Sequence, residues 1–459
     1  MTHSSNGRGF RTDHEPVKRY FGVWILTLFA FTLLLGSSVF PQLFVPQASA
    51  EVGHHSHFRG GTISWIPTGT KGEVQFSVID GFRRSGYAGT AGDGKPAVGD
   101  TILEVIGGTS LNFGDGNSTG ALTYQVDFID VTNDWLLGHA VDTSTGSSLP
   151  IKHTYATSGP FEAGISSCCR TGLEVNNPTG SYAISTTVDL SKTGTSGTNQ
   201  SPVSSFIPIY TCPVGLCTFA ISTADADGDS ISYRLSTDVE ASGVVSGFTQ
   251  PTGLTVNPTT GIVTWNTTGL TLGLWSASVW MDEMRSSSAI GHIQNDFLIN
   301  VVQSTTTNNA PAFDYPPTPA QGTAFTPHVG DTVSFNVQCT DPDAGDTVTL
   351  GIIGQPAGSS FTGTLSGANP ASGNFSYTPS SVGVNAITFT CQDNNGNSAT
   401  PTSVSIVTSI LVVPESPLGT ALLIGSSLAA LGGFLFWKSK RNNSRNGGLG
   451  TSGSFGLGL

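Results

Sequence analysis

The sequence has little charge, and most of the charge it has is negative. Charged residues make up 11% of the 459 residues, and 18 Lys+Arg against 31 Asp+Glu give a formal net charge of −13. So few cations could not neutralise many phosphates, which excludes a basic nucleic-acid binder. Long helices are also disfavoured by the 58 Gly and 25 Pro. A hydrophobic fraction of 37% is nevertheless too high for a fully disordered chain.

Motifs of common enzyme classes are missing as well. The sequence has no H-E-x-x-H, no P-loop, and no G-x-G-x-x-G placed between a strand and a helix, and its nine His are scattered. We therefore expect a protein that is not an enzyme.

The N-terminal segment reads as an export signal. Phe21 to Phe40 holds no charged residue, Lys18 and Arg19 precede it, and Ala48-Ser49-Ala50 follows. A basic region, an apolar run and a small-x-small site predict a signal peptide over 1–50, cut after Ala50. The alternative is an uncleaved anchor, because 20 apolar-type residues could span a bilayer.

The C-terminal segment reads as a membrane anchor. Leu418 to Trp437 is uncharged, and Lys438, Lys440 and Arg441 follow it. This predicts one transmembrane helix with a short cytoplasmic tail, 442–459. The middle of the chain, 51–437, then carries 10 Lys+Arg against 29 Asp+Glu. Such an acidic exterior keeps chains apart and attracts cations.

A short motif precedes that apolar run. Val413-Pro414-Glu415-Ser416-Pro417, the run itself and the basic cluster together resemble PEP-CTERM and related archaeal sorting signals over 413–441. The resemblance implies processing by an exosortase-like or archaeosortase-like enzyme. This chain departs from the pattern, because such signals end soon after the basic cluster. A plain anchor is therefore the safer interpretation.

Strand patterns fill the region between the two ends. Gly72 to Ile79 and Leu122 to Phe128 alternate apolar and polar residues, and 51–412 lacks helical periodicity. Similar openings at Asn199 and Asn308 lie 109 residues apart, which fits one Ig-sized sandwich per unit. We expect an all-β chain of tandem Ig-like β-sandwich domains, at 51–198, 199–304 and 305–412.

Several motifs resemble known surface modules. Thr223 to Tyr233, with its D-x-D-G-D stretch, and Gly253 to Gly261 look like parts of cadherin-like and bacterial Ig repeats, and Asn309 to Phe313 is similar to a cadherin linker. Phe113 to Gly116 and His153 to Tyr155 resemble the F-G-D-G and H-x-Y marks of PKD domains. The resemblance implies a surface protein built of β-sandwiches, with His153 as a structural hydrogen-bonding group.

An even number of cysteines in an exported chain predicts disulfides. Cys339 and Cys391 lie on alternating strands and suit a bridge between two sheets. The other four allow three pairings, and the preferred one crosses between the two pairs Cys168, Cys169 and Cys212, Cys217. The alternatives are a strained bridge between the adjacent cysteines and a four-cysteine zinc site, which the spacing disfavours. N-glycosylation sequons begin at Asn117, Asn199, Asn266 and Asn374.

Acidic turns are the candidate metal sites. Ca²⁺ prefers hard oxygen ligands, and carboxylates at every second position can converge on one ion. The predicted ligands are Asp225, Asp227, Asp229 and Asp282, with Glu283 as a further candidate, and in the next unit Asp341, Asp343, Asp346 and Asp393. The alternative is that these are polar turns whose Asp side chains cap the backbone.

Two other residue groups have weaker readings. His54, His55 and His57 could hold a transition metal, but a disordered polar terminus fits better. The tryptophans that could stack on sugars are more often core at strand positions, and they are Trp65, Trp135, Trp265, Trp275 and Trp280.

We therefore expect a single-pass cell-surface protein with extracellular β-domains. Its expected role is adhesion, matrix formation or envelope structure, with other surface proteins or glycans as partners and Ca²⁺ or disulfides stiffening the joints. One alternative is a glycan-binding module of a surface hydrolase, which an exposed row of Trp or Tyr would favour. Another is an unrecognised hydrolase in 51–198, which two facing carboxylates in a deep cleft would favour.

Overall fold

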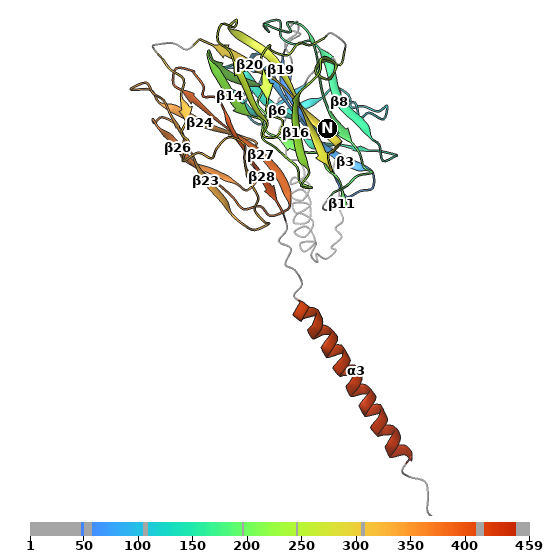
Figure 1. Ribbon diagram of the computed structural model, residues 1–459. Helices are drawn as coiled ribbons and strands as arrows, with labels where there is room; N and C mark the ends of the chain where they lie inside the picture. Colours follow the sequence, from blue (N-terminus) through green and yellow to red (C-terminus); the bar gives the residue numbers. More distant parts are fainter. Residues whose placement is uncertain are drawn as a thin grey trace, which may run out of the picture. The chain divides into compact units, whose positions relative to one another are not determined.

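The computed structural model describes residues 47–49, 57–103, 109–194, 197–244, 247–303, 308–409 and 417–446, with side chains described between residues 57 and 409 and from 427 to 441. Most of the expected signal segment, the motif 413–416 and the tail beyond 446 lie outside these residues. The chain divides into two units, Met1–Ser409 and Ile410–Leu459. The first unit is built mainly of strands (Figure 1), in agreement with the expected all-β class.

One sheet of 13 strands runs through both of the expected N-terminal domains. Its main path is β1-β4-β5-β6-β7-β3-β2-β20-β19-β16; β9 and β13 also pair with β20, and β8 pairs with β9. The strands are β1 (Gln47–Ser49), β2 (Phe58–Pro67), β3 (Glu73–Arg83), β4 (Thr101–Leu103), β5 (Thr123–Asp130), β6 (Trp135–Asp142), β7 (Leu149–Thr154), β8 (Phe161–Cys168), β9 (Ser181–Val188), β13 (Ile209–Pro213), β16 (Ser230–Leu235), β19 (Gly273–Arg285) and β20 (Ser288–Val302). Because β2 pairs with both β3 and β20, the boundary expected at residue 198 does not separate two sheets.

Strand β20 is the centre of this sheet. It is 15 residues long, and its burial pattern includes nine consecutive buried residues. A strand covered on both faces must satisfy any polar group it carries, and β20 carries Gln294, Asn295 and Asp296 in that buried run. It also approaches β2 closely: a Cβ at Gly60 would lie 2.1 Å from the Asp296 carbonyl oxygen, and φ there is +134°. Only glycine tolerates both conditions.

Shorter elements surround the large sheet. Three small sheets pair β10 with β11, β12 with β15, and β18 with both β14 and β17. Their bounds are β10 (Thr193–Gly194), β11 (Gly197–Thr198), β12 (Val203–Ser204), β14 (Leu216–Ala220), β15 (Thr223–Ala224), β17 (Thr255–Val256) and β18 (Ile262–Asn266). The short helices are the 3-10 turn η1 (Arg84–Gly86) and α2 (Asp238–Ser242), and Thr237 and Glu240 form a capping box at the start of α2.

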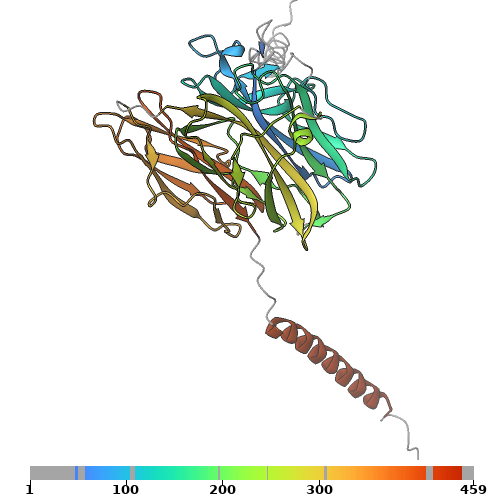
Figure 2. The same ribbon diagram turned by 45° about the horizontal axis from the view of Figure 1, so that its top comes forward.

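Residues 308–409 form a separate two-sheet sandwich, drawn in orange tones beside the large sheet in Figures 1 and 2. One sheet has the order β21-β23-β26-β25 and the other β22-β28-β27-β24. The strands are β21 (Ala312–Phe313), β22 (Thr323–Phe325), β23 (Val333–Thr340), β24 (Val348–Ile353), β25 (Ser360–Thr364), β26 (Ala371–Tyr377), β27 (Gly383–Asp393) and β28 (Thr402–Thr408). Phe375 and Phe389, both fully buried, belong to a core that this sandwich does not share. The expected Ig-like sandwich is therefore present.

The disulfides confirm one prediction and correct another. Cys339 on β23 is bonded to Cys391 on β27, so this bridge joins the two sheets as expected. The expected crossing between the other two pairs is wrong. Cys168 is bonded to Cys169, and Cys212 to Cys217, each within its own part of the chain. The first and second regions are held together by a shared sheet instead, which needs no covalent link.

The second unit contains helix α3 (Pro417–Asn446), which includes the segment expected to cross a membrane. Within the residues that the structure describes, no helix combines the length and the apolarity needed for a membrane span. The expectation of a transmembrane helix over 418–437 therefore has no support from the described residues.

Candidate functional site

The first acidic cluster lies in the turn between β15 and β16. Asp225 and Asp229 of this turn and Glu283 of β19 each offer a carboxylate oxygen, and these oxygens lie within 4.8 Å of one another. Asp225 and Glu283 are buried, with 4% and 2% of their surfaces exposed. Asp225, Asp229 and Glu283 are called the first cluster below.

Hydrogen bonds use only part of the Asp225 carboxylate. Its Oδ1 accepts the backbone N–H groups of Asp227 at 2.8 Å and Asp229 at 3.1 Å. Its Oδ2 is buried and has no hydrogen-bond partner among the described residues. Burial, with repulsion from nearby carboxylates, raises the pKa of Asp225 to about 6 and that of Glu283 to about 8.

Arg285 supplies a positive charge to this cluster. Its Nε donates to Asp229 Oδ1 at 2.8 Å, and its Nη2 pairs with the other oxygen of the same carboxylate. The remaining donors reach Thr193 O at 2.6 Å and Asn199 Oδ1 at 2.7 Å. Asn199 in turn donates its Nδ2 to Glu283 Oε1 at 2.7 Å. The guanidinium and one amide thus tie the cluster together.

Two predicted ligands are not part of the first cluster. Asp227 lies in the same turn, but its Oδ2 accepts the backbone N–H of Gln200 at 3.0 Å. Asp282 is wrong as a member, because alternate residues of a strand point to opposite faces. Its carboxylate accepts from Trp280 Nε1 at 3.0 Å and lies 3.4 Å from Arg234 Nε, while the next residue, Glu283, faces the cluster.

The second acidic cluster lies in the loop after β23. Asp341, Asp343 and Asp346 offer oxygens within 4.8 Å of one another, and they are called the second cluster below. Asp341 is 4% exposed; its Oδ1 accepts the Asp343 backbone N–H at 2.8 Å, and its Oδ2 is buried without a partner among the described residues. Burial and the neighbouring carboxylates raise the pKa of Asp341.

Asp393, at the end of β27, borders the second cluster. Its Oδ1 accepts the backbone N–H groups of Asn395 at 2.9 Å and Asn397 at 2.7 Å, and its Oδ2 accepts Asn308 Nδ2 at 2.8 Å. The Asn395 side chain donates to Asp346 Oδ2 at 2.8 Å. The four predicted aspartates of this domain are therefore neighbours, linked by asparagine amides.

The two clusters differ in their counter-charges. The sequence contains no Lys or Arg from residue 286 to residue 437, so the whole Ig-like sandwich lacks both. None of the ion pairs found among the described residues involves Asp341, Asp343, Asp346 or Asp393.

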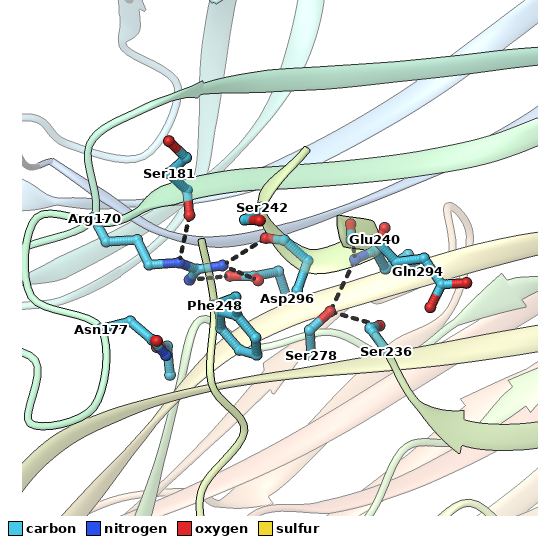
Figure 3. Close-up of polar contacts among 12 residues, drawn as sticks. Arg170, Asn177, Ser181, Ser236, Glu240, Ser242, Phe248, Ser278, Gln294 and Asp296 are labelled. Carbon is cyan, nitrogen blue, oxygen red and sulfur yellow. Dashed lines mark hydrogen bonds and ion pairs between the residues drawn. The ribbon is translucent and has the colours of Figure 1, made fainter. Parts of the chain in front are cut away.

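A buried ion pair in the large sheet was not predicted from the sequence. Arg170 Nη1 and Nη2 donate to the two oxygens of Asp296 at 2.8 and 2.5 Å, and both side chains are at most 1% exposed (Figure 3). Arg170 also donates to Ser181 O and to Ala241 O of α2, each at 3.1 Å, and lies 4.8 Å from the centre of the Phe248 ring. The available signal was a single carboxylate inside the strand pattern of β20, which requires a partner if the strand is buried.

Next to this pair, a polar strip satisfies further buried hydrogen-bonding groups, although the Oε1 of Gln294 has no hydrogen-bond partner among the described residues. Gln294 Nε2 donates to Ser278 Oγ at 2.9 Å and to Glu240 O at 3.0 Å, and the hydroxyls of Ser278 and Ser236 lie 2.8 Å apart (Figure 3). This network positions α2 against the sheet, and we assign it a structural role.

The PKD-like marks meet in space. His153 Nε2 lies 2.7 Å from Asp115 Oδ2, its ring stacks on Phe113 at 4.0 Å, and the Tyr155 hydroxyl donates to Phe113 O at 2.9 Å. The imidazole is therefore part of a packed turn, which is the structural position expected for it.

The N-terminal histidines were expected in a disordered polar terminus. This expectation is wrong for His57, which is buried with 4% exposure. His54 and His55 lie outside the described residues.

The sequons differ in accessibility. Asn117, Asn266 and Asn374 are exposed. Asn199 is 3% exposed and its amide is committed to Glu283 and Arg285, so it is wrong as a glycosylation site in the folded chain.

Among the residues that the structure describes, neither alternative function gains a specific feature. Four of the five candidate tryptophans are buried, and Trp275 is partly buried beside Trp265. A cavity of about 410 Å³ lies between residues 128–135 of the large sheet and the Ig-like sandwich. Its lining includes one carboxylate, that of Asp130, which accepts hydrogen bonds from Asn133.

Two family models match the chain. Residues 59–191 match "Integrin beta-like protein A-E, N-terminal", and residues 308–406 match "Bacterial Ig domain". The segment expected to resemble a PKD domain thus matches an integrin beta-like model, while the Ig-like assignment of the last domain is confirmed. Among curated proteins, integrin beta-like protein A of Dictyostelium discoideum is 27% identical over 389 residues, covering 76% of this chain, and protein C of the same organism is 25% identical over 396 residues, covering 77%.

Those relatives are much longer, and this chain spans 19% of each of them, about a fifth. Among solved structures, three cadherin repeats of Drosophila N-cadherin match with 15% identity and a TM-score of 0.21, covering 59% of this chain and 85% of that one. Tandem Ig repeats of Dlar match with 11% identity and a TM-score of 0.20, covering 46% and 98%. The chain is thus similar to the N-terminal part of integrin beta-like proteins over 59–191 and to a bacterial Ig domain over 308–406.

Proposed function

We propose that this chain is the outward-facing adhesive part of a cell-surface protein. The observation that carries the proposal is the similarity to integrin beta-like protein A, which covers 76% of the chain and so extends well beyond residues 59–191. The names of the matched relatives describe no enzyme. The partners would be other surface proteins or glycans.

Two physical features support an extracellular setting. Three disulfides form among the six cysteines, and disulfides persist in oxidising compartments. The acidic surface keeps copies of the chain apart, so adhesion would depend on specific loops and not on bulk attraction. The segment 1–50 would serve as the export signal.

Adhesion can be measured with beads coated with the purified chain and added to cells that produce it. We expect more beads per cell than with albumin-coated beads. The matched control is the same chain after reduction and alkylation, which breaks all three bridges and should abolish the excess. Equal attachment of native and reduced chains would contradict the proposal. So would protection of the chain from protease added to intact cells.

We also propose that Ca²⁺ acts as a structural ion in the acidic loops, because clustered carboxylates are the ligands it prefers. The whole chain should be used, since β20 belongs to the 13-stranded sheet and a fragment starting at residue 199 would lack two of its partners, β2 and β9. Ca²⁺ should raise the melting temperature, and excess chelator should reverse the rise. Identical melting with Ca²⁺ and with chelator would refute a structural calcium ion.

A further inference from the structure

We infer that the two acidic clusters are not equivalent: the second cluster binds a divalent cation such as Ca²⁺, whereas the first cluster already holds a cation of the chain, the guanidinium of Arg285 paired with Asp229. The inference rests on the calcium role proposed above and assigns that role to one site. It also makes Arg285 a built-in substitute for the metal ion.

In the first cluster, Arg285 holds the position of a cation. All three of its nitrogen atoms are engaged: Nε and Nη2 with Asp229, Nη2 also with Asn199, and Nη1 with Thr193 O. A guanidinium keeps its charge at any physiological pH. A divalent ion would have to displace this side chain and break its hydrogen bonds, so the site is closed while Arg285 is in place.

The second cluster has carboxylates at the same density but no cation. Neither Lys nor Arg occurs anywhere in the Ig-like sandwich. Asp341, Asp343 and Asp346 nevertheless bring their oxygens within 4.8 Å, and Asp393 adds a fourth negative charge at their border. A group of anions this close, without a counter-ion from the chain, is stabilised either by a proton, which the raised pKa of Asp341 favours, or by a cation from solution.

Turn capping does not account for the orphaned oxygen of Asp341. Among the described residues, Asp225 Oδ2 of the first cluster is orphaned as well, so the difference between the clusters rests on Arg285. Turn capping explains Oδ1, which accepts the Asp343 backbone N–H. It does not explain Oδ2, which is buried on a residue only 4% exposed and has no hydrogen-bond partner among the described residues. Leaving such an atom unpaired is costly. Coordination of a cation by Oδ2, with water completing the six to eight oxygens that Ca²⁺ takes, would satisfy it.

Asparagines join this site to the start of the domain. Asn308 donates to Asp393, and Asn309 donates its backbone and side-chain N–H groups to Asp343, the latter at 3.0 Å. An ion held by the second cluster would therefore fix the point at which the chain enters the Ig-like sandwich.

The test is a titration of the full chain with Ca²⁺ by isothermal calorimetry, with Tb³⁺ luminescence as a second probe. The wild type should bind one ion. Asp341→Asn should weaken that binding by about tenfold or more. Asp331→Asn, the same change at an exposed site of the same domain, and Asp225→Asn should leave it within about twofold of wild type. Arg285→Gln should bind a second ion, whereas Arg285→Lys, which keeps a cation, should not. Circular dichroism with Ca²⁺ present checks that the Arg285 variants are folded.

The outcomes separate the two proposals. If neither the wild type nor Arg285→Gln binds an ion, the calcium role itself is refuted. If the wild type binds two ions, or if Asp225→Asn abolishes binding and Asp341→Asn does not, calcium stands and the assignment to the second cluster is overturned. If folded Arg285→Gln gains no ion, Arg285 is not the substitute cation.

Discussion

Removing one partner of the Arg170–Asp296 pair should destabilise the large sheet strongly. Asp296→Asn keeps the shape of the side chain but leaves the guanidinium, which is 1% exposed, without its counter-ion. Breaking a fully buried pair in this way costs about 3–5 kcal/mol. Arg170→Met, which keeps the apolar stem next to Phe248 and strands the carboxylate, should cost a similar amount.

The magnitude can be measured by thermal unfolding followed by tryptophan fluorescence. For a body of roughly 250 residues, each kcal/mol shifts the melting temperature by about 2–4 °C, so the single variants should melt roughly 6–20 °C lower. The matched control is the double variant Arg170→Met with Asp296→Leu. It removes both charges and should lie much closer to wild type, because replacing a buried pair with apolar residues is often neutral or stabilising.

The result also tests whether the first two regions form one body. Arg170 follows β8, and Asp296 lies on β20, on the other side of the boundary expected at residue 198. A single shifted transition is expected for the large sheet. A loss below about 1 kcal/mol for Asp296→Asn, or a double variant as unstable as the singles, would refute the reasoning.

Two further predictions concern a covalent link and a buried acid. Replacing Cys339 and Cys391 together by Ala opens a bridge with a sequence separation of 52, which should lower the free energy of unfolding by about 4 kcal/mol through chain entropy. The same change at Cys212 and Cys217, whose separation is 5, should lower it by about 2 kcal/mol. Urea unfolding of both double variants would show whether this order holds. Burial raises the pKa of Glu283 to about 8 in the folded chain, against an ordinary value of 4.5, so folding favours the protonated carboxyl. The contribution of Glu283 to the free energy of unfolding is therefore fully present below about pH 4.5 and is lost as the pH rises through about 8. In chelator, Glu283→Gln should therefore melt with a weaker fall between pH 5 and 9 than wild type does, and parallel curves would contradict the burial argument.

Local patterns predicted the strands and much of the Ig-like sandwich. Alternation of apolar and polar residues can be read within a single strand. The alternation in β23 and β27 was clear enough to predict that Cys339 and Cys391 face each other between the two sheets. The Asp-rich turns were also recognisable, because they are short and contiguous. Carboxylates that join those turns from distant parts of the chain were harder to recognise, and Glu283 was only a further candidate in the sequence.

Long-range pairing could not be read from the sequence. The turn at Asn199 looked like the opening of a new domain, but β20 returns nearly 100 residues later and pairs with β2. This pairing also explains why Arg170 and Asp296 were missed: no local rule connects two residues 126 positions apart. The preference for crossed disulfides failed for the same reason, since it assumed two bodies that needed a link.

Strand β20 sets how this chain can be rearranged during evolution. An insertion, deletion or exchange of either half of the 13-stranded sheet would leave β20 without β2 and β9, or without β13 and β19. The two halves must therefore be inherited together. The sandwich over 308–409 has its own core and its own bridge, so gene fusion could transfer it between architectures with the loss of only its contacts to the preceding region, such as the Ser403 hydroxyl bonds to Ser222 and to Ala220 O.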